Sequence, residues 1–144
     1  MRLIRFKKND PHIPLFRKQL SSLKDPVMAE CALEEIEELN YLGFAVLNDE
    51  KELLAIASIG FNIGSLAKYT SVPVAGNLYL SNLVGAGKKG AKTFVQYLLK
   101  KADLTNYLIT LTSPETSEKF WTKFGFKEKH LPSFKAFIRL PRTS

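Results

Sequence analysis

A glycine- and lysine-rich turn carries the residues whose types and spacing best suit chemistry. It follows the strand-like run 77–84 and includes Gly85, Gly87 and Gly90. Glycines let main-chain N–H groups approach an anion without a Cβ in the way. A helix that begins at such a turn adds partial positive charge, and the nearby lysines add more. The turn therefore predicts a diphosphate site, and the alternative is an ordinary glycine-rich turn with solvated lysines.

Two familiar phosphate-binding patterns do not explain this turn. A P-loop needs Lys and then Ser or Thr directly after its last glycine, whereas Ala91 follows Gly90 and Lys92-Thr93 come one position late. The dinucleotide pattern G-x-G-x-x-G is present at 85–90. That pattern belongs after the first strand of a domain, with an acidic residue about 20 positions later. Here it lies past the middle of the chain, and no acid ends the next strand.

The elements that must position the turn alternate between strand-like and helical segments. Strands are predicted over 2–7, 41–47, 53–61, 77–84, 107–112 and 134–140, and helices over 13–23, 26–39, 91–103 and 113–125. A tight-turn sequence at 48–51 makes the hairpin 41–61 antiparallel, and the strand–helix–strand unit 77–112 implies parallel pairing. We therefore expect one α/β (α+β) domain over 1–144, with a mixed, partly antiparallel sheet and flanking helices.

A second segment identifies the kind of fold more specifically. The predicted helix 113–125 closes with Phe-Trp-Thr-Lys-Phe-Gly-Phe over 120–126. This segment resembles the helix ending F-Y-x-K-x-G-F of the GNAT superfamily of acyl-CoA-dependent N-acyltransferases, with matches at Phe120, Lys123, Gly125 and Phe126. The family's phosphate loop, R/Q-x-x-G-x-G/A, falls on 87–92, where only Gly90 matches. The phosphate-loop motif is therefore degenerate.

The resemblance implies a GNAT-like sheet that is splayed between its fourth and fifth strands. The pantetheine arm of acetyl-CoA or another acyl-CoA would lie in that gap, and the turn amides would hold the diphosphate. The implied cofactor-binding residues are Asn82, Leu83, Val84, Gly87, Lys88, Lys89, Gly90, Ala91, Lys92 and Phe120. The implied reaction moves an acetyl or other acyl group to an amine of a small molecule or protein, bound against the first helices and 62–76.

The groups that usually move protons in this family are missing from their usual places. Trp121 stands where the family often has a tyrosine, and an indole cannot protonate a leaving thiolate near neutral pH. No Asp or Glu lies within 77–102, so the fourth strand supplies no carboxylate base. Ser117 is the remaining candidate on the last helix, where its hydroxyl would order a water. No metal is expected, because His12 and His130 lack neighbouring ligands.

Charge and composition bound the possible partners. The composition is 45% hydrophobic and 24% charged, which is ordinary for a globular protein, and the net charge is +7. Residues 25–52 carry nine acids against one lysine, whereas 53–144 carry thirteen bases against four acids. The basic part suits an anionic partner. The alternative function is therefore a non-catalytic GNAT-like module that binds nucleic acid or an acidic protein. We expect a cytoplasmic protein without a membrane partner, because no apolar run reaches about 20 residues.

Overall fold

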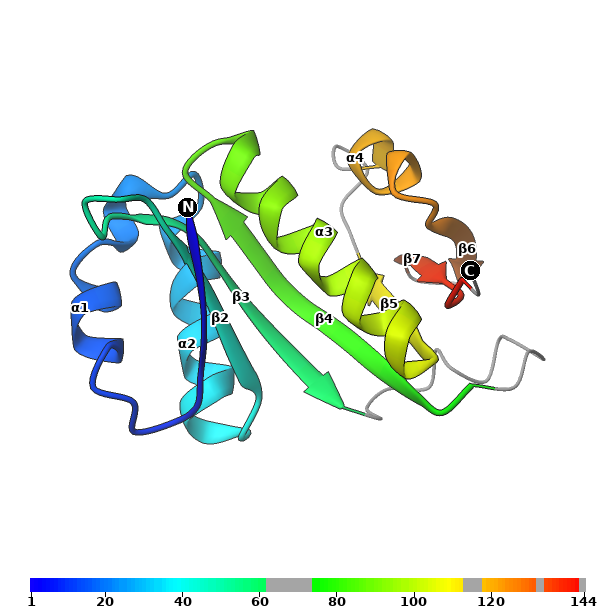
Figure 1. Ribbon diagram of the computed structural model, residues 1–144, viewed down its shortest axis with the longest axis horizontal. Helices are drawn as coiled ribbons and strands as arrows, with labels where there is room; N and C mark the ends of the chain where they lie inside the picture. The colour runs from blue at the N-terminus through cyan, green and yellow to red at the C-terminus, as the bar shows by residue number, and fades with distance from the viewer. Residues whose placement is uncertain (62–73, 113–117, 132–133, 143–144) are drawn as a thin grey trace. The chain divides into compact units, whose positions relative to one another are not determined.

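The computed structural model describes residues 1–61, 74–112, 118–131 and 134–142 (Figure 1). Its strands are β1 (Arg2–Phe6), β2 (Leu42–Leu47), β3 (Leu53–Phe61), β4 (Gly76–Gly85), β5 (Tyr107–Thr112), β6 (Lys127–Leu131) and β7 (Phe134–Arg139). Its helices are α1 (Ile13–Arg17), the 3₁₀ helix η1 (Leu20–Ser22), α2 (Pro26–Glu38), α3 (Lys88–Thr105) and α4 (Glu118–Lys123). The element order is the predicted one, except that the first predicted helix is divided into α1 and η1 and that a further strand, β6, precedes β7.

The strands form one mixed sheet in the order β1-β2-β3-β4-β5-β7-β6. Pairing is antiparallel between β1 and β2 and between β2 and β3. It is also antiparallel between β5 and β7 and between β6 and β7. β4 and β5 pair in parallel, and α3 provides the crossover that parallel neighbours require. The predicted mixed α/β sheet with flanking helices is therefore confirmed.

The contacts of the chain divide it into two compact units. The first unit comprises 1–60 and 81–98, and the second comprises 61–80 and 99–144. β4 and α3 each contribute residues to both units. The expectation of a single domain over 1–144 stays a prediction.

The core of the first unit lies between α1, η1 and α2 on one side and a face of β1, β2, β3 and β4 on the other. Its buried members are Phe6, Ile13, Phe16, Leu20, Leu23, Ala29, Leu33, Ile36, Ala45, Leu47, Leu53, Ile56 and Val84. Phe44 lies on the opposite face of β2, where its ring is 5.4 Å from that of Phe94 on α3. β2 is therefore covered on both faces, which explains why its sequence is almost continuously apolar.

The helix ends follow local rules that the sequence carries. Asp25 caps α2, because its side chain accepts a hydrogen bond from the N–H of Met28 at 3.0 Å, and Pro26 occupies the first helical position. α3 ends before Asn106, which has a φ of 59°, and α4 ends before Gly125, which has a φ of 85°. Left-handed residues of these two types commonly terminate helices.

In the second unit, β4 and β5 pair in register from Gly76 with Tyr107 to Tyr79 with Thr110. A buried hydrogen bond from the Thr110 hydroxyl to the Asn77 side-chain oxygen, at 3.2 Å, joins the two strands. The pairing ends there, so Leu80–Gly85 of β4 have no recorded β5 partner among the described residues. The splay of the fourth and fifth strands that the family resemblance implies stays a prediction, because these β4 residues and β5 belong to different compact units. Among the described residues, no helix has both the length and the apolar character of a membrane span.

Candidate functional site

The turn between β4 and α3 is held against the rest of the first unit by main-chain hydrogen bonds. The N–H of Ala86 donates to the carbonyl of Leu54 at 2.8 Å, which ties the turn to β3. The N–H of Lys24 donates to the carbonyl of Gly85 at 2.9 Å, which ties the turn to the segment before α2. Figure 1 shows the long β4 strand leading through this turn into α3. The turn therefore has a fixed place at the end of β4.

α3 begins three residues earlier than the sequence predicts, at Lys88 instead of about Ala91. In a helix with this start, the N–H groups of Ala91 and Lys92 donate to the carbonyls four residues before them. These two amides therefore belong to the first turns of α3, and the part predicted for them in anion binding stays a prediction. The amides at the very start of α3, Lys88–Gly90, have no acceptor within the helix and can bind an anion.

The three glycines of the turn have different structural roles. A Cβ at Gly90 would lie 2.6 Å from the Leu54 carbonyl oxygen, so this glycine makes room for β3. A Cβ at Gly85 would lie 2.6 Å from the Gly87 carbonyl oxygen, so this glycine makes room for the turn itself. A Cβ at Gly87 would meet nothing within 4 Å. Gly85 and Gly90 therefore make room for neighbouring main chain, whereas Gly87 faces open space, and the use of these glycines by an anion stays a prediction.

Two lysines add positive charge at the start of α3. The side chains of Lys89 and Lys92 are exposed on its first two turns, while the side chain of Lys88 lies outside the described set. No acidic residue occurs in the first turn of α3. The unpaired amides, the helix dipole and these side chains all favour an anion at the same place.

The predicted pantetheine-binding residues lie in the part of β4 that continues beyond its pairing with β5. Asn82 and Leu83 are half-buried, and Val84 is buried in the core of the first unit. A strand edge without a paired neighbour presents main-chain N–H and C=O groups to a ligand that carries amides. The predicted segment therefore has the chemistry that an extended amide-containing arm needs.

A carboxylate reaches β4 from α2, one of the first helices, against which the family resemblance places the acceptor. Glu35 on α2 is half-buried, and its Oε1 accepts a hydrogen bond from the hydroxyl of the fully buried Ser58 at 2.8 Å. Its Oε2 accepts one from the hydroxyl of Ser81 at 2.5 Å, and the side-chain amide of Asn82 donates to Oε1. Glu35 therefore connects α2 with both β3 and β4.

This cluster has two consequences for the interpretation of β4. Regular alternation places Ser81 and Asn82 on opposite faces of a strand, whereas here both side chains donate to one carboxylate. β4 therefore departs from strict alternation at this point. The second consequence is chemical: an ionised carboxylate offers about four lone-pair positions, and donors among the described residues use three of those of Glu35, which leaves one for a further donor.

Sequence reasoning missed Glu35 because it searched for a base only within 77–102. The available signal was helical spacing, because Glu35 follows Ala32 by three residues, and residues three apart share a helix face. Ala32 is fully buried, as are its neighbours on the stripe, Leu33 and Ile36. Glu34, by contrast, is exposed.

The helix-end motif of the second unit is an aromatic cluster. The rings of Phe120 and Phe124 are 5.2 Å apart, which confirms the predicted packing of residues four apart on one face. Trp121 is 7% exposed, and its ring lies 4.8 Å from Phe120 and 5.3 Å from Phe126. Trp121 therefore has a packing role. Ser117, the predicted water-ordering residue, lies outside the described residues.

The structure brings together one part of the predicted site. Asn82, Leu83, Val84 and 87–92 all belong to the first unit, as do Glu35 and Ser58. Phe120 belongs to the second unit, and its role in cofactor binding stays a prediction. No cluster of three side chains suited to a metal ion occurs among the described residues.

Comparison with known proteins identifies the fold. No protein-family model and no curated protein matches the sequence. Three solved structures are similar over nearly the whole of both chains. The N-acetyltransferase YlbP of Bacillus subtilis, in complex with coenzyme A, has a TM-score of 0.67 at 18% identity and covers 97% of this chain and 96% of its own. The aminoglycoside 6'-N-acetyltransferase of Enterococcus faecium has a TM-score of 0.61 at 18% identity, with complete coverage of both chains.

The third is the ribosomal-protein-S18-alanine N-acetyltransferase of Escherichia coli, with a TM-score of 0.58 at 11% identity over 99% of this chain and 97% of its own. Identities this low establish the likeness at the level of the fold. That likeness agrees with the mixed sheet, the parallel β4–β5 pair and the α3 crossover. The chain therefore has the fold of the GNAT acetyltransferases.

Proposed function

We propose that the protein is an N-acyltransferase that moves an acetyl or other acyl group from coenzyme A to an amine. The observation that carries the proposal is the end of β4–β5 pairing at Tyr79, which leaves the following β4 residues to bind an extended ligand. The GNAT fold and the anion-binding start of α3 support it further. Of the solved structures with this fold, YlbP is in complex with coenzyme A.

The residues of the first unit fit the parts of an acyl coenzyme A. The main-chain groups of Asn82, Leu83 and Val84 would pair with the pantetheine amides. The amides of Lys88–Gly90 would bind the diphosphate, with Gly87 leaving space beside it. Lys89 and Lys92 would add charge. The bound group would supply an acyl thioester, which amines attack readily once the two are oriented.

Glu35 would receive the proton of the acceptor amine. An acceptor amine is largely protonated near neutral pH and must lose a proton before its nitrogen can attack. Three donors in the described part of the chain orient the Glu35 carboxylate, and they leave one lone-pair position for an ammonium N–H or a bridging water. Its partner Asn82 belongs to the predicted pantetheine-binding segment. These contacts would place proton removal beside the acyl group.

Assays with different amines can identify the class of acceptor. The solved structures with this fold include an aminoglycoside acetyltransferase and a ribosomal-protein N-acetyltransferase. Another, AtaT, is complexed with acetyl-methionyl-tRNA. We therefore propose a panel of aminoglycosides, peptides with free N-termini and aminoacyl-tRNA, with thiol release and product mass as the readouts.

The first test is binding of acetyl-CoA, measured by titration calorimetry and by the melting temperature at millimolar ligand. Gly87→Glu introduces a carboxylate beside the proposed diphosphate, where no atom lies within 4 Å of the new Cβ. Like charges brought together cost several kcal/mol, so we expect binding at least tenfold weaker. The matched control is Gly87→Gln, which has the same shape without the charge and is expected to bind within about threefold of wild type. Equal binding by Gly87→Glu and Gly87→Gln, or no binding by the wild-type protein, would overturn the proposal.

A further inference from the structure

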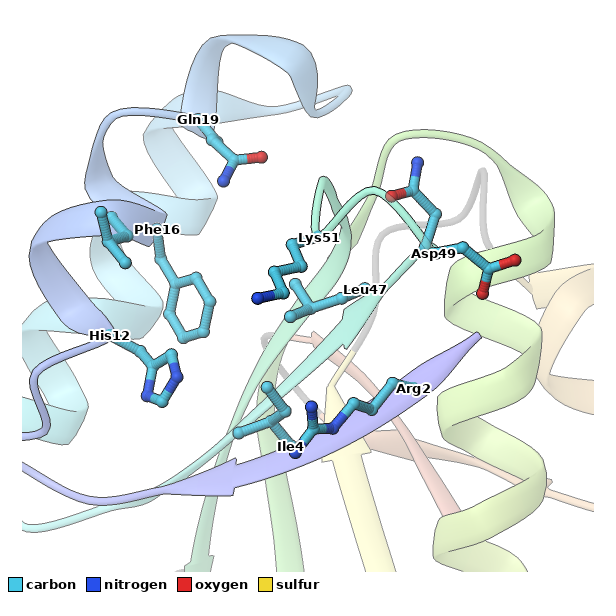
Figure 2. A pocket seen from close by; sticks show the side chains of 10 residues that line it. Arg2, Ile4, His12, Phe16, Gln19, Leu47, Asp49 and Lys51 are labelled. Carbon is cyan, nitrogen blue, oxygen red and sulfur yellow. The ribbon is translucent and has the colours of Figure 1, made fainter.

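A cavity of about 440 Å³ lies in the first unit, and none of the residues that line it is among those proposed to bind coenzyme A (Figure 2). Residues of β1, of α1 with the turns on either side of it, and of the β2–β3 turn line it. Small-molecule sites in proteins typically have volumes of about 300–1,000 Å³. The cavity is therefore large enough for a small organic ligand.

Basic side chains dominate the polar part of the cavity. Arg2, His12 and Lys51 line it, and Figure 2 shows the Lys51 ammonium extending toward Phe16. Neither Arg2 nor Lys51 forms an ion pair within the described parts of the chain. The one lining carboxylate, that of Asp49, is fully exposed and lies 3.9 Å from the amino terminus. The positive charges of Arg2 and Lys51 therefore lie at the cavity, and neither is ion-paired with a carboxylate among its lining residues.

The chain fixes the position of two of these basic residues. The Asn48 side-chain oxygen accepts hydrogen bonds from the N–H groups of Glu50 at 3.0 Å and Glu52 at 2.8 Å, which holds the β2–β3 turn. Lys51 has a φ of 63° within that turn. The Asp10 carboxylate contacts Nδ1 of His12 at 2.8 Å, so Nε2 is the ring nitrogen left for a ligand. Groups held in this way lose less entropy when they bind.

The remaining wall of the cavity is apolar. Leu47 and Phe16 are buried at its base, and Leu15 is 55% exposed beside it. The His12 ring is stacked on Phe16, with 5.8 Å between their centroids and 19° between their planes. An exposed leucine next to buried apolar side chains gains free energy when an apolar ligand covers it. The cavity therefore suits a ligand with one charged end and one apolar part.

We propose that this cavity binds a small organic anion, with its carboxylate or phosphate against Arg2 and Lys51 and its apolar part against Leu15 and Leu47. The arginine guanidinium can donate two parallel hydrogen bonds to either kind of oxyanion. The Lys51 ammonium adds a point charge, and Nε2 of His12 adds a third polar contact. The site is separate from the proposed coenzyme site, and no step of the proposed acyl transfer depends on it.

The test is an NMR titration of the ¹⁵N-labelled protein with phenyl phosphate, with phenylacetate and with neutral benzyl alcohol. We expect saturable shifts at the amides of Leu15, Phe16 and Leu47 with at least one anion, and binding at least tenfold weaker with benzyl alcohol. The stronger of the two anions identifies the charged group as phosphate or carboxylate. The proposal is wrong if neither anion saturates these shifts, or if benzyl alcohol binds equally well.

Two variants examine the charged end of the site. Arg2→Gln and Lys51→Asn should each weaken anion binding at least fivefold, and asparagine tolerates the left-handed backbone at position 51. The control is Lys18→Gln, an exposed lysine that makes the same change in charge without lining the cavity. Equal weakening by Lys18→Gln would show an effect of net charge alone and would also overturn the proposal. A parallel titration with acetyl-CoA follows residues 87–90, so failure at one site is distinguishable from failure at the other.

Discussion

Glu35 is the residue on which the proposed proton transfer depends. Hydrogen bonds from Ser58, Ser81 and Asn82 hold both of its carboxylate oxygens, and these donors come from two different strands. A carboxylate held by three donors keeps one orientation. A remaining lone pair then points to a fixed place, as general-base catalysis requires. In the proposed mechanism, Glu35 of α2 takes the place of the carboxylate that the fourth strand lacks.

Replacing Glu35 with glutamine tests this role directly. The Glu35→Gln variant keeps the size of the side chain but cannot accept a proton, so we expect kcat to fall about 100-fold. KM for acetyl-CoA should change less than about threefold, because the proposed coenzyme contacts are main-chain groups. Steady-state kinetics with the best acceptor of the panel measures both quantities.

Glu34→Gln is the matched control, because Glu34 is the neighbouring exposed residue of the same helix. It should retain wild-type kcat. A Glu35→Gln enzyme with normal kcat, or a loss shared equally with Glu34→Gln, would contradict a role for Glu35 in proton transfer. A fall in melting temperature without a fall in kcat would assign Glu35 to packing alone.

Local residue roles could be predicted because they depend on near neighbours in sequence. Asp25 caps α2 three residues before Met28, and Phe120 packs on Phe124 one helical turn later. Glu35 could not be placed, because its partners Ser81 and Asn82 are 46 and 47 residues away. A contact of that range depends on the register of the strands, which no local pattern encodes.

Among the elements, α3 shows best how tertiary contacts change a local prediction. Glycine inside a helix costs about 1 kcal/mol relative to alanine, so the sequence favours a helix that starts after Gly90. The structure starts α3 at Lys88 and places Gly90 against the main chain of β3. Packing that only a glycine permits outweighs the propensity cost. The predicted loop therefore becomes the first turn of a helix.

The two glycines at this helix start should respond differently to the same substitution. Gly90→Ala places a methyl group 2.6 Å from the Leu54 carbonyl oxygen, so we expect a loss of about 1–2 kcal/mol in the free energy of unfolding. Gly87→Ala has open space around its Cβ and should change this free energy by less than about 0.5 kcal/mol. Urea denaturation followed by circular dichroism measures both. Equal effects of the two substitutions would show that α3 is not packed against β3 as described.

At the scale of the whole molecule, the directions in which two pairs of strands run could be predicted from the sequence. The division of the chain into two compact units could not. The hairpin 41–61 and the crossover 77–112 follow from turn residues and from the handedness rule, and both are observed. The two compact units could not be predicted, because no linker separates them. The same strand, β4, and the same helix, α3, contribute to both.

The carboxylate of Asp103 holds residues 139–142 within the second unit. The guanidinium of Arg139 on β7 donates two hydrogen bonds to the carboxylate of Asp103 on α3, at 2.8 and 3.0 Å. The N–H of Arg142 donates to the same carboxylate at 2.9 Å. Arg139 is only 3% exposed, so Asp103 neutralises a buried charge. Loss of that carboxylate would leave the guanidinium buried without its counter-ion.

The pH dependence of stability follows from the sign of the Asp103 shift. Hydrogen bonds from Arg139 lower the pKa of Asp103 below its usual value near 3.8. The unfolded chain therefore takes up this proton first as the pH falls. The stabilisation is present above about pH 4 and is lost as the pH drops through the lower pKa of the folded state.

We expect Asp103→Asn to lower the free energy of unfolding by about 1–2 kcal/mol at pH 7, a difference that shrinks below pH 4. Urea denaturation between pH 2.5 and 7 measures this difference, with the fully exposed Asp49→Asn as the control. A difference that stays constant with pH, or one that Asp49→Asn reproduces, would show that the Asp103 charge does not hold the chain end.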